Sequence, residues 1–379
     1  MSLKILFCGG GTAGHVNPAL AIAACVLQKH PDAAVECAAS TQPSDKAKEL
    51  VGRAGHKLSR VHIRGMKRPL YSPSNVITAA YMVISRAEAK RIIKRFGPDI
   101  IVGTGGYACW PILSRGADMG IPTLLHESNV IPGLAVKRLK NKVDRVLVNF
   151  EETRKLLDAV DSDTRVIRVG NPFMPGFGNA DGISRTEARA ALGLTESDVY
   201  ILSFGGSLGS ATLNSAVIRM CDELMARVPD AVLHHAAGKG NFDEAKAEFA
   251  RTRSYTNDRV QILDYIYDMP TRMAAADIVI SRAGAMSVSE LALGAKAAIL
   301  VPSPNVADDH QYKNAKAVED AGGCVCVQEK EFDRLCGEVI RLAGSAQLRE
   351  ELGKNIRKKF ATPDANEKIY SEIMKLIKS

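Results

Sequence analysis

The sequence has few aromatic residues and no long apolar run, and both shortages exclude broad classes of protein. Aromatic residues make up 5% of the 379 residues, and only one is tryptophan. They show no pattern of alternation with basic residues, which argues against a surface that stacks nucleic-acid bases. No apolar stretch reaches the length of a membrane span, and residues 3–8 are too few for a signal peptide. We expect no nucleic-acid partner.

The eight cysteines lack the spacing of a metal site or a disulfide framework. The sequence contains no C-x-x-C pair, and only Cys324 and Cys326 stand close together. Scattered thiols are typical of proteins in a reducing compartment. We therefore expect free thiols, no zinc site and a cytoplasmic protein.

The net charge of +8 is distributed unevenly along the chain. Residues 1–150 contain 21 Lys and Arg but 9 Asp and Glu, whereas the remainder contains 29 and 33. Between residues 53 and 95 there are eleven basic residues and one acid, Glu88. A basic half favours contact with an extended anionic surface, and the shortage of aromatics favours a membrane leaflet over nucleic acid. A solvated basic surface without a partner is the alternative.

Short apolar runs that end in glycine or small polar residues alternate with helix-like stretches throughout the chain. This alternation predicts an α/β fold with two doubly wound parallel sheets, in domains 1–172 and 173–362, and a closing helix within 363–379. Residues 173–182 are rich in Gly and Pro and predict the linker. The expected strands are residues 3–8, 33–39, 57–63, 99–102, 122–126, 145–150, 165–169, 199–204, 231–237, 260–263, 277–280 and 298–301.

The stretch Ser281–Glu290 is the strongest candidate for a ligand site. It follows a β-branched run and begins a helix, so it predicts a strand, a small-residue turn and a helix start. The first N–H groups of a helix attract anions, and a nucleotide diphosphate fits such a site. Glu290, one turn into the helix, can accept hydrogen bonds from ribose hydroxyls. A simple turn with a solvated Glu290 is the alternative. Residues 205–210 form a second glycine-rich turn of this kind.

The first glycine turn has two interpretations. Gly9, Gly11 and Gly14 satisfy G-x-G-x-x-G, and Glu36 lies at a suitable distance for a ribose-binding acid, which would indicate a nicotinamide-dependent oxidoreductase. However, Glu36 lies inside an apolar run rather than at its end. His15 follows the last glycine, where an imidazole is more useful for proton transfer.

Residues 74–96 predict a long amphipathic helix that carries a basic stripe. Between this helix and the preceding strand, residues 66–71 form a basic and apolar loop suited to lying on an anionic bilayer. The expected apolar face consists of Val76, Ile77, Ala80 and Ile84, and the expected stripe consists of Arg86, Lys90 and Lys94.

Together these segments resemble the ordered motifs of one bacterial family. The segments are GGGTAGHVNPALAIA, GTGGYACWP, HESNVIPG, VGNP, FGGSLGSATLN, SRAGAMSVSELA and VPSPNVADDHQYKNA. The chain resembles the undecaprenyldiphospho-muramoylpentapeptide β-N-acetylglucosaminyltransferases, which transfer N-acetylglucosamine from UDP-N-acetylglucosamine to lipid I and so make lipid II of peptidoglycan. The resemblance implies a GT-B fold, with two Rossmann-like domains facing across a cleft. It implies an N-terminal domain that binds lipid I and a peripheral location on the inner face of the cell membrane.

The resemblance also implies residue roles. The implied donor-binding residues are Thr12, Asn129, Ser207, Ile266, Ala285, Met286, Glu290, His310 and Gln311. The implied acceptor-diphosphate residues are Gly10, Gly11, Gly14, Gly105, Gly106 and Tyr107. The sequence departs from the family where an Arg often follows the GNP motif by two positions, because Met174 stands there.

Forming a β-glycoside from an α-linked sugar nucleotide requires one in-line displacement with inversion. His15 is the candidate base and Glu127 the reserve. Asp308 and Asp309 are the only conspicuous acidic pair, and they precede the sugar-contacting residues, so we expect no protein-bound catalytic metal and no cofactor. The alternatives are another UDP-sugar enzyme of the same fold, such as a lipid glycosyltransferase or a UDP-N-acetylglucosamine 2-epimerase, the oxidoreductase, or a catalytically silent lectin-like protein.

Overall fold

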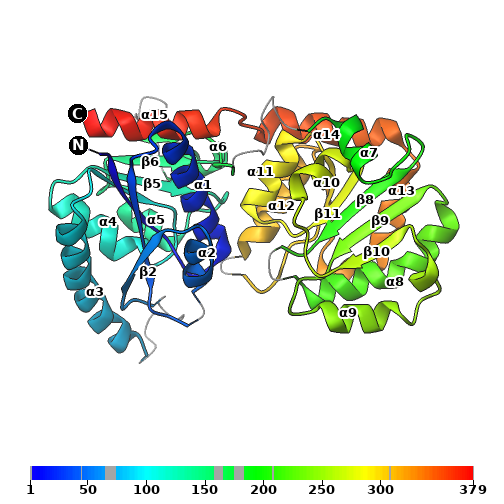
Figure 1. The fold of residues 1–379 in the computed structure, drawn as a ribbon, viewed down its shortest axis with the longest axis horizontal. Coiled ribbons are helices and arrows are strands. Elements are labelled where there is room, and N and C mark those ends of the chain that lie inside the picture. The colour runs from blue at the N-terminus through cyan, green and yellow to red at the C-terminus, as the bar shows by residue number, and fades with distance from the viewer. Residues whose placement is uncertain are drawn as a thin grey trace. The chain divides into compact units, whose positions relative to one another are not determined.

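The computed structural model describes residues 2–43, 45–64, 74–157, 165–174, 183–206, 209–306 and 309–378. The chain forms two compact units, Met1–Pro175 with Asp364–Ser379, and Gly176–Pro363. Each unit is a parallel sheet flanked by helices (Figure 1). The predicted fold class is therefore confirmed. The linker expected at residues 173–182 and the lipid-contact loop expected at residues 66–71 lie mostly or wholly outside the described residues.

The first unit alternates strands and helices as its apolar runs predict. Its sheet has seven strands in the order β3-β2-β1-β4-β5-β6-β7. The elements are β1 (Lys4–Cys8), α1 (Ala13–Lys29), β2 (Ala34–Ser40), α2 (Ala47–Arg53), β3 (Lys57–Val61), α3 (Ser74–Phe96), β4 (Ile100–Gly103), α4 (Cys109–Asp118), β5 (Thr123–Glu127), α5 (Leu134–Leu139), β6 (Arg145–Val148), α6 (Glu151–Leu156), β7 (Val166–Arg168) and α15 (Ala365–Lys378).

The second unit repeats this plan with a six-stranded sheet in the order β10-β9-β8-β11-β12-β13. Its elements are α7 (Arg185–Ala191), β8 (Val199–Phe204), α8 (Ala211–Arg227), β9 (Ala231–Ala236), α9 (Phe242–Phe249), η1 (Arg253–Thr256), β10 (Val260–Leu263), α10 (Met269–Ala275), β11 (Ile278–Ser281), α11 (Ala285–Leu293), β12 (Ala297–Leu300), α12 (His310–Asp320), β13 (Val325–Cys326), η3 (Glu329–Arg334), α13 (Leu335–Ala343) and α14 (Ala346–Phe360).

Each sheet has one point where the strand order reverses direction, and that point locates a ligand site. In the first sheet the reversal lies between β1 and β4, and in the second it lies between β8 and β11. The loops that leave the carboxyl ends of two such strands diverge to opposite faces of the sheet, which leaves a crevice between them. The predicted glycine turns follow these four strands, so each unit brings two of them together.

The central strands are buried because helices cover both faces of each sheet. Ile5 and Phe7 of β1 pack on one side, in a cluster with α1 and α15, whereas Leu6 and Cys8 pack on the other side. Because both faces of the sheet are covered, the sequences of these strands are continuous hydrophobic runs and do not alternate between apolar and polar residues. This is why their positions could be predicted closely.

The final helix, α15, belongs to the first unit. Ile369, Ile373 and Leu376 enter the same core cluster as α1, and Figure 1 shows red α15 beside dark-blue α1. The Asn366 side chain donates to the Phe173 carbonyl at 2.8 Å and accepts from the Phe173 amide at 2.9 Å. Two distant segments of the sequence are therefore joined in one folded unit.

The predicted helix at residues 74–96 is α3, but its predicted apolar face is partly wrong. Ile84 is 46% exposed and Val83 is 73% exposed. Ser85, Ala89 and Ile93 face the core instead, and the small side chains of Ser85 and Ala89 allow α3 to pack closely on α4. Of the remaining predicted apolar residues, the side chains of Val76, Ile77 and Ala80 lie outside the described part.

The predicted basic stripe on α3 is only partly exposed. Lys90 and Lys94 are exposed, whereas Arg86 forms an ion pair with Asp118 at 2.5 Å and lies over the Trp110 ring. Among the helices of the described ranges, none combines the length and the hydropathy needed to cross a bilayer.

Candidate active site

His15 is held at the reversal point of the first sheet by the turn that follows β4. It is the third residue of α1, and its Nδ1 lies 3.2 Å from the Thr104 carbonyl oxygen. The Thr104 hydroxyl in return donates to the His15 carbonyl at 2.6 Å. Because a carbonyl can only accept, the neutral imidazole carries its proton on Nδ1. This leaves Nε2 as the nitrogen that can accept a proton.

The glycine turn after β4 is required by the position of this imidazole. Gly105 has a φ of +96°, and a side-chain carbon there would lie 2.6 Å from His15 Nδ1. Gly106 approaches the carbonyl oxygen of Gly10 equally closely, since a side-chain carbon there would lie 2.4 Å from it. The structure therefore brings together the predicted residues Gly10, Gly105, Gly106 and His15.

Tyr107 and Asp45 complete the surroundings of the first glycine turn. A side-chain carbon at Gly11 would lie 3.4 Å from the Tyr107 ring, and one at Gly10 would lie 2.6 Å from Asp45 Oδ2. Burial raises the pKa of the Tyr107 phenol, which a hydrogen bond with Ser40 partly offsets. The roles of Tyr107 and of these glycines, including Gly14, toward an acceptor diphosphate stay predictions.

Asp45 is a buried residue that sequence reasoning missed. Its carboxylate accepts hydrogen bonds from the Ser40 hydroxyl at 2.7 Å and the Ala47 amide at 3.0 Å. Ser40 ends β2, next to β1, so an acid shortly after this strand lies at the ligand edge of the sheet. The pattern of a strand end followed by Asp before a helix was the available signal.

Glu127 organises the loop that carries Asn129. Its carboxylate accepts from the Asn129 amide at 2.9 Å, the Asn129 side chain at 3.2 Å and the Gly133 amide at 2.8 Å. Both oxygens of this carboxylate are thus engaged by N–H groups of its own loop, which they hold in place. This geometry favours His15 over Glu127 as the base. The donor-sugar contacts expected of Asn129 and Thr12 stay predictions.

Glu36 has a structural role that argues against the dinucleotide interpretation. It lies inside β2, is 2% exposed, and forms ion pairs with Arg95 and, at 3.7 Å, with Lys57. The Ser59 hydroxyl donates to the same carboxylate. A side chain that is buried and paired within the sheet is not presented to a ribose.

Glu290 is the last residue of Ser281–Glu290, the predicted ligand site of the second unit. Gly284 precedes α11, Ala285 is the first residue of that helix, and Glu290 lies one to two turns along it. Burial raises the pKa of the Glu290 carboxyl to about 7. Its side chain has no hydrogen-bond or ion-pair partner among the described residues. A half-buried acid without a partner is suited to accept hydrogen bonds from a ligand.

The other predicted donor residues of the second unit lie on loops and helix starts that follow strands of its sheet. Ile266 is buried in the turn after β10, and Met286 follows Ala285 in α11. His310 begins α12, and the side chain of Gln311 accepts from the Ser303 amide at 2.9 Å. Ser207 and Asp308 lie outside the described residues. The contacts of these residues with a donor stay predictions.

Arg282 is a second residue that sequence reasoning missed, although it lies inside the stretch Ser281–Glu290. It follows β11, is 8% exposed and donates to the carbonyls of Val301 and Pro302 at 3.2 and 3.3 Å. It also donates to the Thr212 hydroxyl at 3.0 Å. Arg282 therefore connects the loops that follow β11 and β8 across the reversal point. Its partners are distant in sequence, so only the tertiary structure reveals this role.

Comparison with known proteins identifies the family. Residues 5–148 match the glycosyltransferase family 28 N-terminal domain, and residues 200–369 match the glycosyltransferase family 28 C-terminal domain. The chain belongs to glycosyltransferase family 28. It is thus an enzyme of the predicted class, and the family resemblance expected from the motifs is confirmed.

Two full-length relatives of this family 28 chain carry the same name, UDP-N-acetylglucosamine–N-acetylmuramyl-(pentapeptide) pyrophosphoryl-undecaprenol N-acetylglucosamine transferase. The relative from Acetivibrio thermocellus is 36% identical over 382 residues, covering 100% of this chain and 99% of the relative. The relative from Bacillus licheniformis is 34% identical over 376 residues, covering 99% of each.

Solved structures agree with this family 28 assignment. The crystal structure of Acinetobacter baumannii MurG matches with a TM-score of 0.76 and 26% identity, over 98% of this chain and 99% of that one. A UDP-GlcNAc 2-epimerase from Neisseria meningitidis matches with a TM-score of 0.61 and 14% identity, over 99% of this chain and 100% of that one. At that identity, the epimerase shows a shared fold and nothing about activity.

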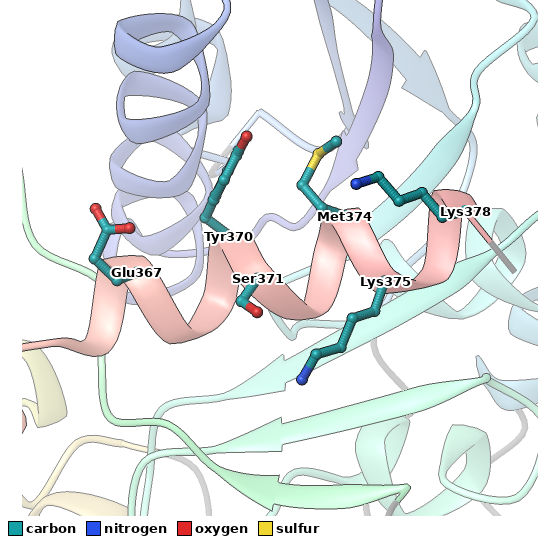
Figure 2. Close-up of a pocket in the computed structure, with 6 residues that line it drawn as sticks. All are labelled: Glu367, Tyr370, Ser371, Met374, Lys375 and Lys378. Carbon is teal, nitrogen blue, oxygen red and sulfur yellow. The ribbon is translucent and has the colours of Figure 1, made fainter.

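A surface hollow in the first unit of this family 28 enzyme contains none of the predicted site residues. It has a volume of 410 Å³ and is lined by Glu367, Tyr370, Ser371, Met374, Lys375 and Lys378 of α15 (Figure 2). Two of these side chains attach α15 to α1: Glu367 pairs with Lys29 at 2.9 Å, and the Tyr370 hydroxyl lies 2.7 Å from His30 Nε2. We therefore assign this hollow to helix packing.

Proposed function

We propose that this chain transfers N-acetylglucosamine from UDP-N-acetylglucosamine to the 4-hydroxyl of the muramoyl sugar of lipid I. The product is lipid II, a precursor of peptidoglycan. The observation that carries this proposal is the match, over nearly the whole of both chains, to relatives named for that reaction. The two reversal-point sites support it, because one suits a uridine diphosphate and the other places an imidazole beside a glycine turn.

The second unit supplies the donor half of the reaction. The first N–H groups of α8 and α11 follow β8 and β11, where a diphosphate would meet two helix N-termini. As the sugar–phosphate bond breaks, these dipoles stabilise the negative charge that develops on the leaving UDP. We expect these groups to supply that field without a protein-bound metal. Glu290 would accept from the ribose hydroxyls.

The first unit supplies the acceptor half. The acceptor hydroxyl attacks the anomeric carbon from the face opposite the leaving diphosphate, so the configuration inverts. His15 Nε2 would accept the hydroxyl proton, with Nδ1–H held by Thr104. The Gly10 and Gly105 backbones would leave room for the acceptor diphosphate.

A turnover assay tests the function. Purified protein is mixed with UDP-N-acetylglucosamine and a lipid I analogue, and UDP release and the disaccharide product are measured. We expect UDP release to depend on the acceptor. Acceptor-independent release of UDP would instead favour the epimerase alternative.

Glu290 predicts a pH dependence of donor binding. A ribose would bind the carboxylate form, so binding lowers the carboxyl pKa from about 7. Below pH 7 the free enzyme holds a proton that must leave, and donor affinity falls by up to about tenfold per pH unit. Titration calorimetry with UDP-N-acetylglucosamine between pH 6 and 8 measures this, because its diphosphate diester does not titrate there.

The Glu290→Gln variant should bind the donor more weakly at pH 8 and lose this pH dependence. The exposed Glu244 on α9 is the matched control, and Glu244→Gln should behave as the wild type. A wild-type dissociation constant that stays flat from pH 6 to 8 contradicts the ribose-binding role of Glu290.

We further propose that the enzyme binds the anionic inner leaflet of the cell membrane through α3. Val83 and Ile84 are exposed on this helix, and Lys90, Arg91 and Lys94 are exposed about two to three turns further along. Apolar side chains beside basic ones suit the boundary between headgroups and acyl chains. Lysines near such a surface each add about 1 kcal/mol of attraction.

Replacing Val83 and Ile84 together by serine should weaken binding to vesicles that contain phosphatidylglycerol by about tenfold, since each loses part of the transfer energy of an aliphatic side chain. Vesicle sedimentation measures this. Leu156→Ser removes a similarly exposed side chain from α6 and should have no effect. Equal loss in both variants would contradict a surface confined to α3.

A further inference from the structure

One ion pair in the second unit contacts the helix start expected to bind the donor diphosphate. The Arg282 guanidinium forms an ion pair with Glu329 at 2.5 Å. Glu329 begins η3, and its carboxylate also accepts from the Thr212 hydroxyl at 2.8 Å. Glu329 lies outside the motifs that carry the family resemblance, so sequence reasoning assigned it no role.

Two of the residues that this pair contacts, Ser210 and Thr212, lie in the first turn of α8. Ser210 is the N-cap, and its hydroxyl accepts from the Leu213 amide at 3.3 Å and from Arg282. Thr212 is the second residue of the helix and binds both members of the pair. The orientation of this turn therefore depends on Arg282 and Glu329 as well as on the glycine turn that precedes it.

The orientation of the first turn matters because its N–H groups, apart from the Leu213 amide that Ser210 caps, have no partner inside the helix. Those groups are the donors that the proposed function directs at the diphosphate. Arg282 is bound on its other side to Val301 and Pro302, which follow β12. One guanidinium thus joins the segments after β8, β11 and β12, and Glu329 adds a fourth segment.

We propose that Glu329 is a positioning residue for the donor diphosphate. Through Arg282 and Thr212 it holds the first turn of α8 in the orientation that binds the phosphates, and this role rests on the proposed function. Without Glu329 the buried guanidinium loses its counter-charge and shifts toward the remaining acceptors or solvent. The Ser210 cap and the Thr212 hydroxyl then lose their common anchor.

The direction in which donor affinity changes when Glu329 is replaced distinguishes a positioning role from a purely electrostatic one. If Glu329 acted only as a negative charge near an anion site, its removal would strengthen donor binding. A positioning role predicts the opposite result. Glutamine at this position keeps an oxygen acceptor for Arg282 and Thr212 while removing the charge, so it should restore most of the function.

Steady-state kinetics with UDP-N-acetylglucosamine and a lipid I analogue test the proposal. We expect Glu329→Ala to raise KM for the donor about tenfold, with kcat changed less than about threefold and KM for the acceptor unchanged. Glu329→Gln should remain within about threefold of the wild type. Glu223→Ala is the control. Glu223 lies on α8, the helix whose first turn Glu329 contacts, and pairs with Arg227 at an exposed position near the other end of that helix.

Thr212→Val provides a second variant, since it removes one hydroxyl and leaves the ion pair in place. We expect its KM for the donor to be about threefold higher than that of the wild type.

An unchanged or lower donor KM in Glu329→Ala overturns the proposal. A Glu329→Gln variant that is as impaired as Glu329→Ala overturns it as well. Calorimetry with UDP measures the same effect without turnover. A wild-type enzyme that binds UDP but does not use lipid I would refute the proposed function, whereas normal UDP binding by Glu329→Ala would refute this inference alone.

Discussion

Replacing His15 by alanine is expected to lower kcat by about 10²- to 10⁴-fold, the usual contribution of a positioned general base. The Thr104 carbonyl fixes the imidazole so that Nε2 accepts the proton of the attacking hydroxyl. Donor affinity should change little, because the donor residues of the second unit are untouched. Single-turnover kinetics at saturating donor and acceptor measure the chemical step directly.

The control for this variant is His56→Ala, which removes another imidazole of the first unit from the turn before β3. It should retain full kcat. If His15→Ala also retains it, the base lies elsewhere, and Glu127→Gln becomes the next variant to test. Glu127→Gln can also lower kcat, because Glu127 holds the Asn129 loop. In that case the pH–rate profile should change for His15→Ala and stay unchanged for Glu127→Gln.

The Gly209→Ala substitution should lower the free energy of unfolding of the second unit by about 3 kcal/mol or more. Gly209 has a φ of +70°, and a side-chain carbon would lie 1.9 Å from the Ala237 carbonyl oxygen. Two backbone segments would have to separate, in addition to the strain of a left-handed conformation for alanine. Denaturant unfolding followed by circular dichroism measures the loss.

Gly206→Ala in the same turn is the matched control. Gly206 also has a positive φ, of +85°, but no atom of the described residues lies within 4 Å of an added side-chain carbon. Only the conformational strain of about 1–2 kcal/mol then applies. If both variants unfold at the same denaturant concentration, the contact with Ala237 does not determine the stability of this turn.

Much of the fold could be predicted from the sequence because the central strands are buried on both faces. The run at residues 260–263 is β10 itself, and residues 74–96 are α3 itself. The buried face of α3 could not be predicted so well, because apolar residues occur all around that helix. Ile84 matched the expected period, yet the packing against α4 selects Ser85 and Ala89.

The candidate site could be predicted only where its residues stand beside glycine turns. His15 follows such a turn directly and Glu290 lies on the helix that follows another, so their positions near the sheet edges follow from the strand pattern. Arg282 and Glu329 are 47 residues apart, and no local pattern relates them. Asp45 contacts the first glycine turn through space. Pairings of this kind depend on how loops from non-neighbouring segments meet, which one sequence does not encode locally.

The position of α15 has a consequence for the order in which the protein can mature during synthesis. Ile369 and Ile373 fill a core that also contains Ile5 and Phe7. A nascent chain that has emerged as far as residue 363 can already close the second sheet, while the face of the first sheet that α1 covers still lacks α15. The first unit is therefore completed only after the second, and the apolar surface that α15 covers is available to chaperones until that helix has emerged from the ribosome.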